Sequence, residues 1–249
     1  MERPDKYAEE KEVIMQIFRE HKGRYGYRRI TLELGNRGYI LNEKTVHKLM
    51  GECGIKCEIR RKKYRSYKGN IGHVADNLLN RDFKSDKPNE KWVTDVTEFQ
   101  ILEEKVYLSP ILDLFNGEII SYNISLRPKF AQVMNMLDKA FSKISDGTNL
   151  ILHSDQGWQY RMERYHKKLA KKGIRQSMSR KGNCLDNAVI ENFFGILKSE
   201  MFYENEFNSV EHLIAEIESY IDYYNNQRIR CKLKGLTPVD YRVQSLKIA

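Results

Sequence analysis

Apolar residues recur at helical spacing over the first fifty residues of the chain. Residues 6–22 carry apolar side chains on one side, two glycines then interrupt the pattern, and residues 27–34 resume it. Asn42 is suited to begin a third helix over residues 43–52, because its side chain can accept a hydrogen bond from the first turn. The pattern predicts three short helices around a small apolar core. The inward positions are Val13, Ile14, Ile17, Phe18, Val46, Leu49 and Met50.

From residue 91 the pattern changes to that of strands. Three strand candidates, at residues 91–101, 105–113 and 118–126, are separated by turn signals that include Asn116-Gly117. Helical and strand-like segments then alternate, which predicts a mixed α/β sheet flanked by helices. These segments are a helix over residues 129–145, a strand over 149–152, a helix over 161–171, a strand over 174–178, a loop over 179–185, a helix containing Glu191 and a last helix over 210–224.

These patterns divide the chain into three parts. We expect a helix-turn-helix-like DNA-binding domain over residues 1–65, a linker over residues 66–90, and an α/β core with C-terminal helices over residues 91–249. The linker has mixed polarity and no clear period. The first domain has a simpler alternative as a helical cap on the core, because many small three-helix bundles never touch DNA.

Composition narrows the class of protein. Of the 249 residues, 41% are hydrophobic and 31% charged, as in soluble globular proteins. No apolar run approaches the ~20 residues that a membrane helix needs, and no signal peptide is visible. The four cysteines are too few for a disulfide scaffold. We therefore expect a cytoplasmic protein with no membrane partner.

Positive charge is concentrated in the first third of the sequence. The net charge is +9, and residues 1–90 hold 21 Lys and Arg against 14 Asp and Glu, a net charge of +7. The densest run is Arg60-Arg61-Lys62-Lys63-Tyr64-Arg65. Nucleic acid is the natural partner for such a charge distribution. A solvated basic surface that serves solubility is the alternative.

Three acidic residues that are far apart in the sequence are placed where they can converge. Asp155 follows an apolar run at the end of a predicted strand, Asp95 lies in a strand-like segment, and Glu191 borders the apolar stripe of a helix. Carboxylates that meet without a cation raise each other's pKa, so their usual partner is a divalent metal ion. Taken singly, each residue also fits a surface, turn or ion-pair position.

The residues around these acids resemble those of bacterial insertion-sequence transposases and retroviral integrases. There are 35 residues between Asp155 and Glu191, and Lys198 follows Glu191 by seven positions. The likeness covers nearly the whole chain and is closest to the OrfB type of the IS-three family. The matching segments are Thr94-Asp95-Val96-Thr97, His153-Ser154-Asp155-Gln156-Gly157-Trp158-Gln159-Tyr160, Asp186-Asn187-Ala188-Val189-Ile190-Glu191-Asn192-Phe193-Phe194 and the tail positions Tyr224, Asn225, Arg228, Leu236, Thr237, Pro238, Tyr241 and Arg242.

The resemblance implies a ribonuclease H-like core, which agrees with the predicted order of strands and helices. It implies a transposase that cleaves DNA at transposon ends and transfers the strand into target DNA, with two Mg²⁺ (or Mn²⁺) ions per active site. Asp95 would bridge the two ions, while Asp155 and Glu191 would each hold one. It also implies a bacterial, nucleoid-associated protein that forms a homo-oligomer on DNA. A product of an upstream reading frame, separate or fused, would be a further partner.

Other residues are expected to support this site. Asp186, as the N-cap of the Glu191 helix, and Asn187, one turn before Glu191, are expected to orient it. His153 is expected to have a structural role. The spacing of Cys53 and Cys57 does not fit the zinc domain of retroviral integrases, so incidental thiols are favoured. The expected DNA contacts are Arg28, Arg29, Arg60, Arg61, Lys62, Lys63, Arg65, Gln159, Tyr160 and Lys198, with a basic cluster of nine Lys and Arg over residues 161–181.

Two other functions remain open at this point. One is a non-catalytic DNA-binding protein whose ribonuclease H-like domain is a relic, although the intact set of three acids argues against it. The other is a plain metal-dependent nuclease that hydrolyses DNA without strand transfer. An assay that supplies both end DNA and target DNA separates the nuclease from the transposase.

Overall fold

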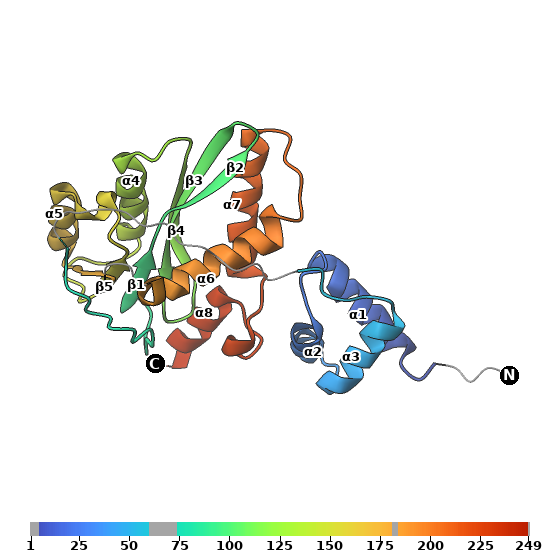
Figure 1. Ribbon diagram of the computed structural model, residues 1–249. Helices are drawn as coiled ribbons and strands as arrows, with labels where there is room; N and C mark the ends of the chain where they lie inside the picture. Colours follow the sequence, from blue (N-terminus) through green and yellow to red (C-terminus); the bar gives the residue numbers. More distant parts are fainter. Residues whose placement is uncertain (1–4, 60–73, 181–183, 249) are drawn as a thin grey trace. The chain divides into compact units, whose positions relative to one another are not determined.

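Three short helices form where the apolar spacing predicts them. They are α1 (Ala8–Glu20), α2 (Tyr27–Asn36) and α3 (Glu43–Glu52) (Figure 1). The computed structural model of the protein describes residues 5–59, 74–180 and 184–248. The side chain of Asn42 accepts a hydrogen bond from the Thr45 amide at 2.8 Å, as expected of the residue that begins α3. The helices bury a shared apolar core.

The last residues of the chain form one unit with these helices. Met1–Arg61 and Asp222–Ala249 group together, and Lys62–Ile221 form a second unit. The first unit contains the end of α7 (Val210–Asn226), the short turn η4 (Cys231–Leu233) and α8 (Pro238–Ile248). The predicted division instead kept residues 91–249 together. The periodicity of a segment shows that it has an apolar face, but not which partner covers that face.

Tyr25 links the two segments of the first unit. Its side chain is fully buried, its hydroxyl donates to the Gln227 carbonyl at 3.3 Å, and it accepts a hydrogen bond from the Ile229 amide at 2.9 Å. Ile229 itself packs in the core of the three helices. The C-terminal segment is therefore held by a buried hydrogen bond as well as by apolar contact.

We expect Tyr25→Phe to lower the free energy of unfolding by about 1–3 kcal/mol, because it leaves the buried Ile229 amide without its acceptor. Urea unfolding of the whole chain, followed by circular dichroism, measures this change. Tyr39→Phe is the matched control, since the Tyr39 hydroxyl donates to Glu9 at the exposed surface. Its effect should stay within about 0.5 kcal/mol. Equal effects of the two variants would contradict the proposed linking role of Tyr25.

One mixed sheet organises the second unit. Its order is β2-β3-β1-β5-β6, with β4 also paired to β3. Strand β1 runs antiparallel to β3 and parallel to β5, and β5 runs parallel to β6. The strands are β1 (Lys91–Thr94), β2 (Thr97–Ile101), β3 (Glu104–Asp113), β4 (Ile119–Ser125), β5 (Ile151–Ser154) and β6 (Arg175–Met178).

The strand predicted over residues 91–101 is divided in two by Asp95 and Val96. Its halves, β1 and β2, pair with successive parts of the same strand, β3. A carboxylate oxygen of Asp95 accepts a hydrogen bond from the Val96 amide at 2.7 Å, which competes with regular strand pairing at this point. The single strand expected over residues 91–101 is therefore two strands, and Asp95 directly follows the end of β1, the middle strand of the sheet.

Two helices cover one face of this sheet. α4 (Phe130–Phe141) and α5 (Glu163–Lys172) share a buried cluster with strand residues such as Trp92 and Leu152. α5 ends at Gly173, as predicted, where φ of +79° favours a residue without a side chain. Within the described ranges, no helix is both long and apolar enough to cross a membrane.

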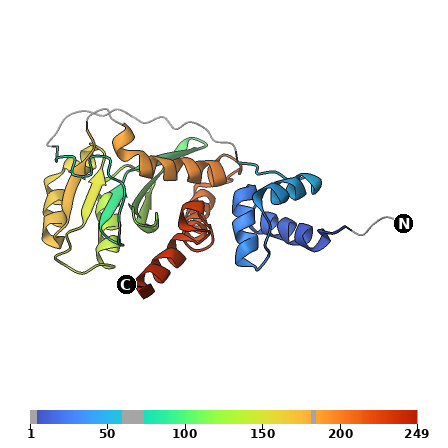
Figure 2. The ribbon, with the colours of Figure 1, turned by 90° about the horizontal axis from the view of Figure 1, so that it is seen from below.

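A further helix, α6 (Ala188–Leu197), contacts β1 and contributes none of its buried side chains to that cluster. It continues into a π-helical turn, η3 (Lys198–Phe202). Figure 2 shows it as the orange helix that passes above the strands of the second unit. α6 therefore lies against the strand that directly precedes Asp95.

Candidate active site

Asp95 and Asp155 follow two neighbouring parallel strands. β1 and β5 are in register from Lys91 opposite Ile151 to Val93 opposite His153, and continuing this register by two positions places Asp95 beside Asp155. Neighbouring strands lie about 4.8 Å apart. The two acids therefore leave the sheet side by side at the carboxyl ends of β1 and β5, where ligands collect in α/β sheets.

Glu191 joins this pair from the first turn of α6. Burial raises the pKa of Asp95 well above its ordinary value, and the charges of Asp155 and Glu191 raise it further. The pKa of Glu191 is raised by burial and then by the charge of Asp155. The pKa of Asp155 is also raised by burial, although the Gly157 amide and Arg161 act in the opposite direction. The three acids thus lie within one another's electrostatic field.

The chemistry of this donor set fits a hard divalent cation. Mg²⁺ and Mn²⁺ take oxygen ligands, and all three side chains are carboxylates. No three His, Cys, Asp or Glu side chains of the described residues are already close enough to enclose an ion. Burial disfavours the charged form of all three carboxyl groups, and neighbouring carboxylate charge adds to this for Asp95 and Glu191. A divalent cation held among them would favour their ionised forms.

We expect metal-free Asp95→Asn to be more stable than the metal-free wild type at neutral pH. A carboxyl group whose pKa is raised on folding contributes stability below its unfolded pKa, about 3.9, and loses it as the pH rises through the folded value. The advantage of the variant should therefore shrink as the pH falls from 7.5 to 4.5. Urea unfolding in the presence of a chelator, at each pH, measures the difference in free energy of unfolding between the variant and the wild type.

Asp86→Asn serves as the control for this experiment, because Asp86 is exposed. This variant should show no comparable advantage at either pH. Mg²⁺ should stabilise the wild type and Asp86→Asn more than Asp95→Asn, since a ligand that binds only the folded state stabilises it. An Asp95→Asn variant less stable than the wild type at pH 7.5 without metal would contradict the electrostatic description of the site.

The residues after Asp155 differ from the expected DNA contacts. Tyr160 is fully buried, 5.5 Å from the ring of Tyr165, and burial together with the charges of Asp95 and Asp155 raises its pKa. The expectation that Tyr160 touches DNA is therefore wrong, because its side chain packs beneath the acids. Gln159 is half-buried, whereas Trp158 is 49% exposed. Sequence reasoning passed over Trp158, although it lies three positions after Asp155.

Lys198 lies where α6 gives way to the π-helical turn. Its ammonium nitrogen is 5.2 Å from the centre of the Phe99 ring, and burial lowers its pKa while Glu98 acts in the opposite direction. Both neighbours belong to β2. Contact of Lys198 with DNA stays a prediction. The structure shows the Lys198 ammonium partly shielded from water.

The basic residues of the first unit are only partly described. Arg28 is exposed, whereas Arg29 is half-buried and lies 5.3 Å from the centre of the Tyr25 ring. Arg60, Arg61, Lys62, Lys63 and Arg65 lie outside the described residues. Cys53 and Cys57 are half-buried free thiols.

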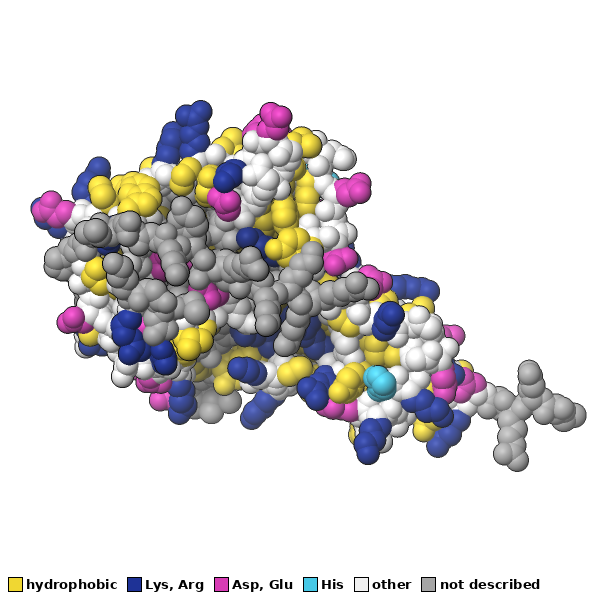
Figure 3. All heavy atoms as spheres, viewed as in Figure 1, with side chains coloured by type: hydrophobic (Ala, Val, Ile, Leu, Met, Phe, Trp, Pro, Cys, Tyr) yellow, Lys and Arg dark blue, Asp and Glu magenta, His cyan; other side chains and the backbone are white. Residues whose placement is uncertain are grey.

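Acidic partners reduce the charge of the basic cluster in the second unit. Lys167 pairs with Glu163, and Lys168 and Lys172 pair with Asp138 and Asp146. Figure 3 shows Lys and Arg side chains in separate groups, among acidic ones, on the visible face. Local ion pairs therefore take up part of the positive charge that the sequence suggested for DNA.

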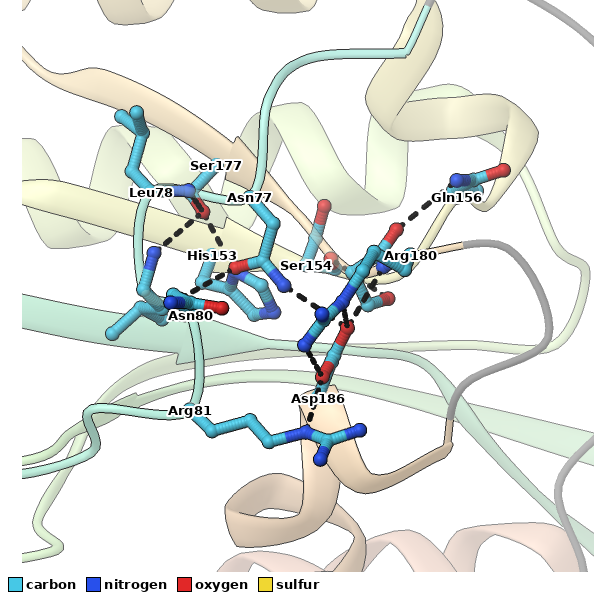
Figure 4. A network of polar contacts seen from close by, with 12 residues as sticks. Asn77, Leu78, Asn80, Arg81, His153, Ser154, Gln156, Ser177, Arg180 and Asp186 are labelled. Carbon is cyan, nitrogen blue, oxygen red and sulfur yellow. Dashed lines mark hydrogen bonds and ion pairs between the residues drawn. The ribbon is translucent and has the colours of Figure 1, made fainter.

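Asp186 does not begin α6, contrary to expectation. Asn187 occupies the N-cap position and makes no side-chain capping bond, whereas Asp186 lies in the preceding turn η2 (Cys184–Asn187). Hydrogen bonds from Arg180 and Arg81 hold the pKa of Asp186 well below its ordinary value, despite its burial. The carboxylate of Asp186 thus bonds to arginines, and Figure 4 shows these contacts.

His153 has the environment of a structural residue. It is fully buried, and its Nδ1 lies 2.8 Å from the hydroxyl oxygen of Ser177. Burial lowers the pKa of His153 to about 4, so the ring is neutral at physiological pH. This agrees with the structural role expected for it.

Family models match three parts of the chain. A model described as an integrase core domain matches residues 85–184, and a second model of the same description matches residues 191–246. A model described as an HTH-like domain matches residues 5–63. Together they cover the predicted helical domain and most of the predicted core.

Several curated proteins are similar along nearly their whole length. InsK of insertion sequence element IS150, from Escherichia coli strain K12, is 56% identical over 98% of this chain and 87% of that protein. The transposase for insertion sequence element IS904 of Lactococcus lactis is 37% identical over 96% of this chain and 97% of that protein. Transposase InsF for IS3A of Escherichia coli strain K12 is 34% identical over 94% of this chain and 82% of that protein.

Solved structures confirm the fold class. The HTLV-2 integrase catalytic core domain in complex with magnesium, in its trimeric form, matches with a TM-score of 0.51 and 18% identity, over 64% of this chain and 99% of that chain. A chain of the simian T-cell lymphotropic virus intasome in complex with PP2A regulatory subunit B56 gamma matches with a TM-score of 0.50 and 17% identity. The match covers 87% of this chain and 70% of that chain. The prediction of a ribonuclease H-like core with an N-terminal helical region is confirmed.

Proposed function

Because the chain belongs to the insertion-sequence transposases of the IS-three family, OrfB type, we propose that Asp95, Asp155 and Glu191 are its catalytic carboxylates. The protein is a DDE-type polynucleotidyl transferase that acts in transposition and DNA integration. The observation that carries the residue assignment is the shared register of β1 and β5, which sets Asp95 beside Asp155 while α6 presents Glu191.

Asp95, Asp155 and Glu191 would together hold two Mg²⁺ or Mn²⁺ ions. When bound, the ions supply Lewis acidity for cutting and joining phosphodiester bonds. The chain supplies the rigid support, because Asp95 and Asp155 follow hydrogen-bonded strands. Asp155 is held further by the Gly157 amide, which donates to its carboxylate at 2.9 Å. Arg161 adds positive charge near Asp155.

We propose that DNA is the partner of both domains. The protein would cleave at transposon ends and then direct the freed 3′-hydroxyl to a target phosphodiester. Recognition of the ends would need the product of an upstream reading frame, separate or fused, and the active form would be a homo-oligomer on DNA. We also place it in the cytoplasm, associated with the nucleoid.

A strand-transfer assay tests this function. The protein, or its fused longer form, is incubated with labelled end DNA, target DNA and Mg²⁺. Joined products that require Mg²⁺ support the proposal, whereas cleavage without joining would indicate a nuclease. The relic hypothesis is not favoured, because all three acids and their surroundings are present.

A further inference from the structure

A segment that the sequence assigned to the linker lines the edge of the sheet in the second unit. Residues 75–81, here called the strap, run along β6. The Met178 amide donates to the Asp76 carbonyl at 3.2 Å, and the hydroxyl oxygen of Ser177 accepts from the Leu78 and Leu79 amides at 2.9 and 3.4 Å. Because Ser177 also lies 2.8 Å from His153 on β5, the strap is connected to the strand that leads to Asp155.

The strap is also tied to the turn that precedes α6. The Asp186 carboxylate accepts hydrogen bonds from Asn77 Nδ2 at 3.0 Å and Arg81 Nε at 3.0 Å, both on the strap. It accepts further bonds from the Arg180 amide at 3.0 Å and from Arg180 Nε and Nη2 at 2.9 and 3.1 Å. Figure 4 shows Asp186 at the centre of these donors.

Burial of the Asp186 carboxylate favours a single position of the turn before α6. The Asp186 side chain is 0% exposed, while those of Arg81 and Arg180 are 45% and 51% exposed. A buried carboxylate without its partners is strongly unfavourable, so the turn has one favourable position, that in which Asp186 meets both arginines. Asp186 is five residues before Glu191, and only the N-cap residue Asn187 separates it from the first turn of α6.

We propose that Asp186 is a positioning residue, which with Arg81 and Asn77 of the strap fixes the start of α6 and so the place of the Glu191 carboxylate. The strap thereby belongs to the framework of the catalytic site. This inference rests on the proposed function, because it assumes that Glu191 binds metal. It concerns the position of Glu191 and assigns no contact with DNA to the strap.

Arg81→Ala tests the proposal, because it removes one donor at the surface and leaves Arg180 on Asp186. The readout is the Mg²⁺ concentration that gives half of the thermal stabilisation in the absence of DNA. We expect this concentration to rise about 10-fold, as is typical when the support of a metal ligand is lost. Saturating Mg²⁺ should restore most of the strand-transfer rate, and Arg81→Lys should restore part of the metal affinity.

Two further variants complete the test. Asn77→Ala removes the other strap donor to Asp186 and should shift the Mg²⁺ dependence in the same direction. Arg127→Ala is the matched control, because it removes an exposed arginine outside this network and should leave the Mg²⁺ dependence unchanged. Amide hydrogen exchange should be faster over residues 184–192 in Arg81→Ala but unchanged in the control.

The outcomes separate this inference from the proposed function. An Mg²⁺ dependence of Arg81→Ala equal to that of Arg127→Ala would overturn the inference alone. So would a defect seen only as weaker, salt-sensitive DNA binding, since Arg81 would then be a DNA contact. Absence of Mg²⁺ stabilisation and of strand transfer in the wild type would overturn the proposed function, and the inference with it.

Discussion

Asp155→Asn is expected to lower both DNA cleavage and strand transfer by about 10³-fold or more. A divalent cation contributes several kcal/mol to the stabilisation of charge in the reaction, and each 1.36 kcal/mol corresponds to about tenfold in rate. Asparagine keeps an oxygen that can accept the Gly157 amide, so the loop after β5 should retain its conformation. Single-turnover assays with end DNA and Mg²⁺ measure the loss.

DNA binding should survive this substitution. The variant removes a negative charge from the site, and the basic residues that meet phosphates are unchanged, so binding should remain as salt-sensitive as in the wild type. Asp146→Asn is the control, because Asp146 is exposed and pairs with Lys172. Its activity should stay close to that of the wild type. Near-normal strand transfer by Asp155→Asn would exclude Asp155 from the catalytic site.

Trp92→Ala is expected to lower the free energy of unfolding by about 3–5 kcal/mol, the usual cost of removing a large side chain from a packed core. Trp92 is 0% exposed, and it lies on β1 in the cluster that joins the sheet to α4 and α5. It is also three residues before Asp95. Chemical unfolding at constant temperature measures the change, and strand transfer should fall with the folded fraction.

Trp158 provides the matched control, because the chain contains only two tryptophans. Trp158 is 49% exposed and contacts Phe130 with ring centroids 6.5 Å apart. Trp158→Ala should therefore cost less than about 1 kcal/mol. Comparable losses of stability in the two variants would mean that the sheet does not pack as described.

Local patterns in the sequence were sufficient for most elements of the fold. The apolar spacing located α1 to α3, and Asn42 begins α3 as its side chain suggests. The alternation of strands and helices after residue 91 predicted the ribonuclease H-like core, which the solved structures confirm. These patterns are readable because burial of one face imposes a period on the residues of a single element.

The sequence and the tertiary structure each supplied part of the candidate site. The sequence placed Asp95, Asp155 and Glu191 in segments that resemble a known family, but it predicted one continuous strand over residues 91–101. The structure shows that β1 ends just before Asp95 and that its register with β5 sets two acids side by side. Pairing between strands about sixty residues apart leaves no local period, so only the tertiary structure could decide it.

The sequence by itself determined most of the helices and strands, which three acids could meet, and the family to which the chain belongs, but it missed α8 and the division of β1 from β2. The tertiary structure decided that Tyr160 is buried, that residues 222–249 join the N-terminal helices, and that Asp186 bonds to the strap. Each of these depends on which distant surface or donor a side chain meets. Burial and hydrogen bonding between distant segments are properties of the folded chain, and no single segment encodes them.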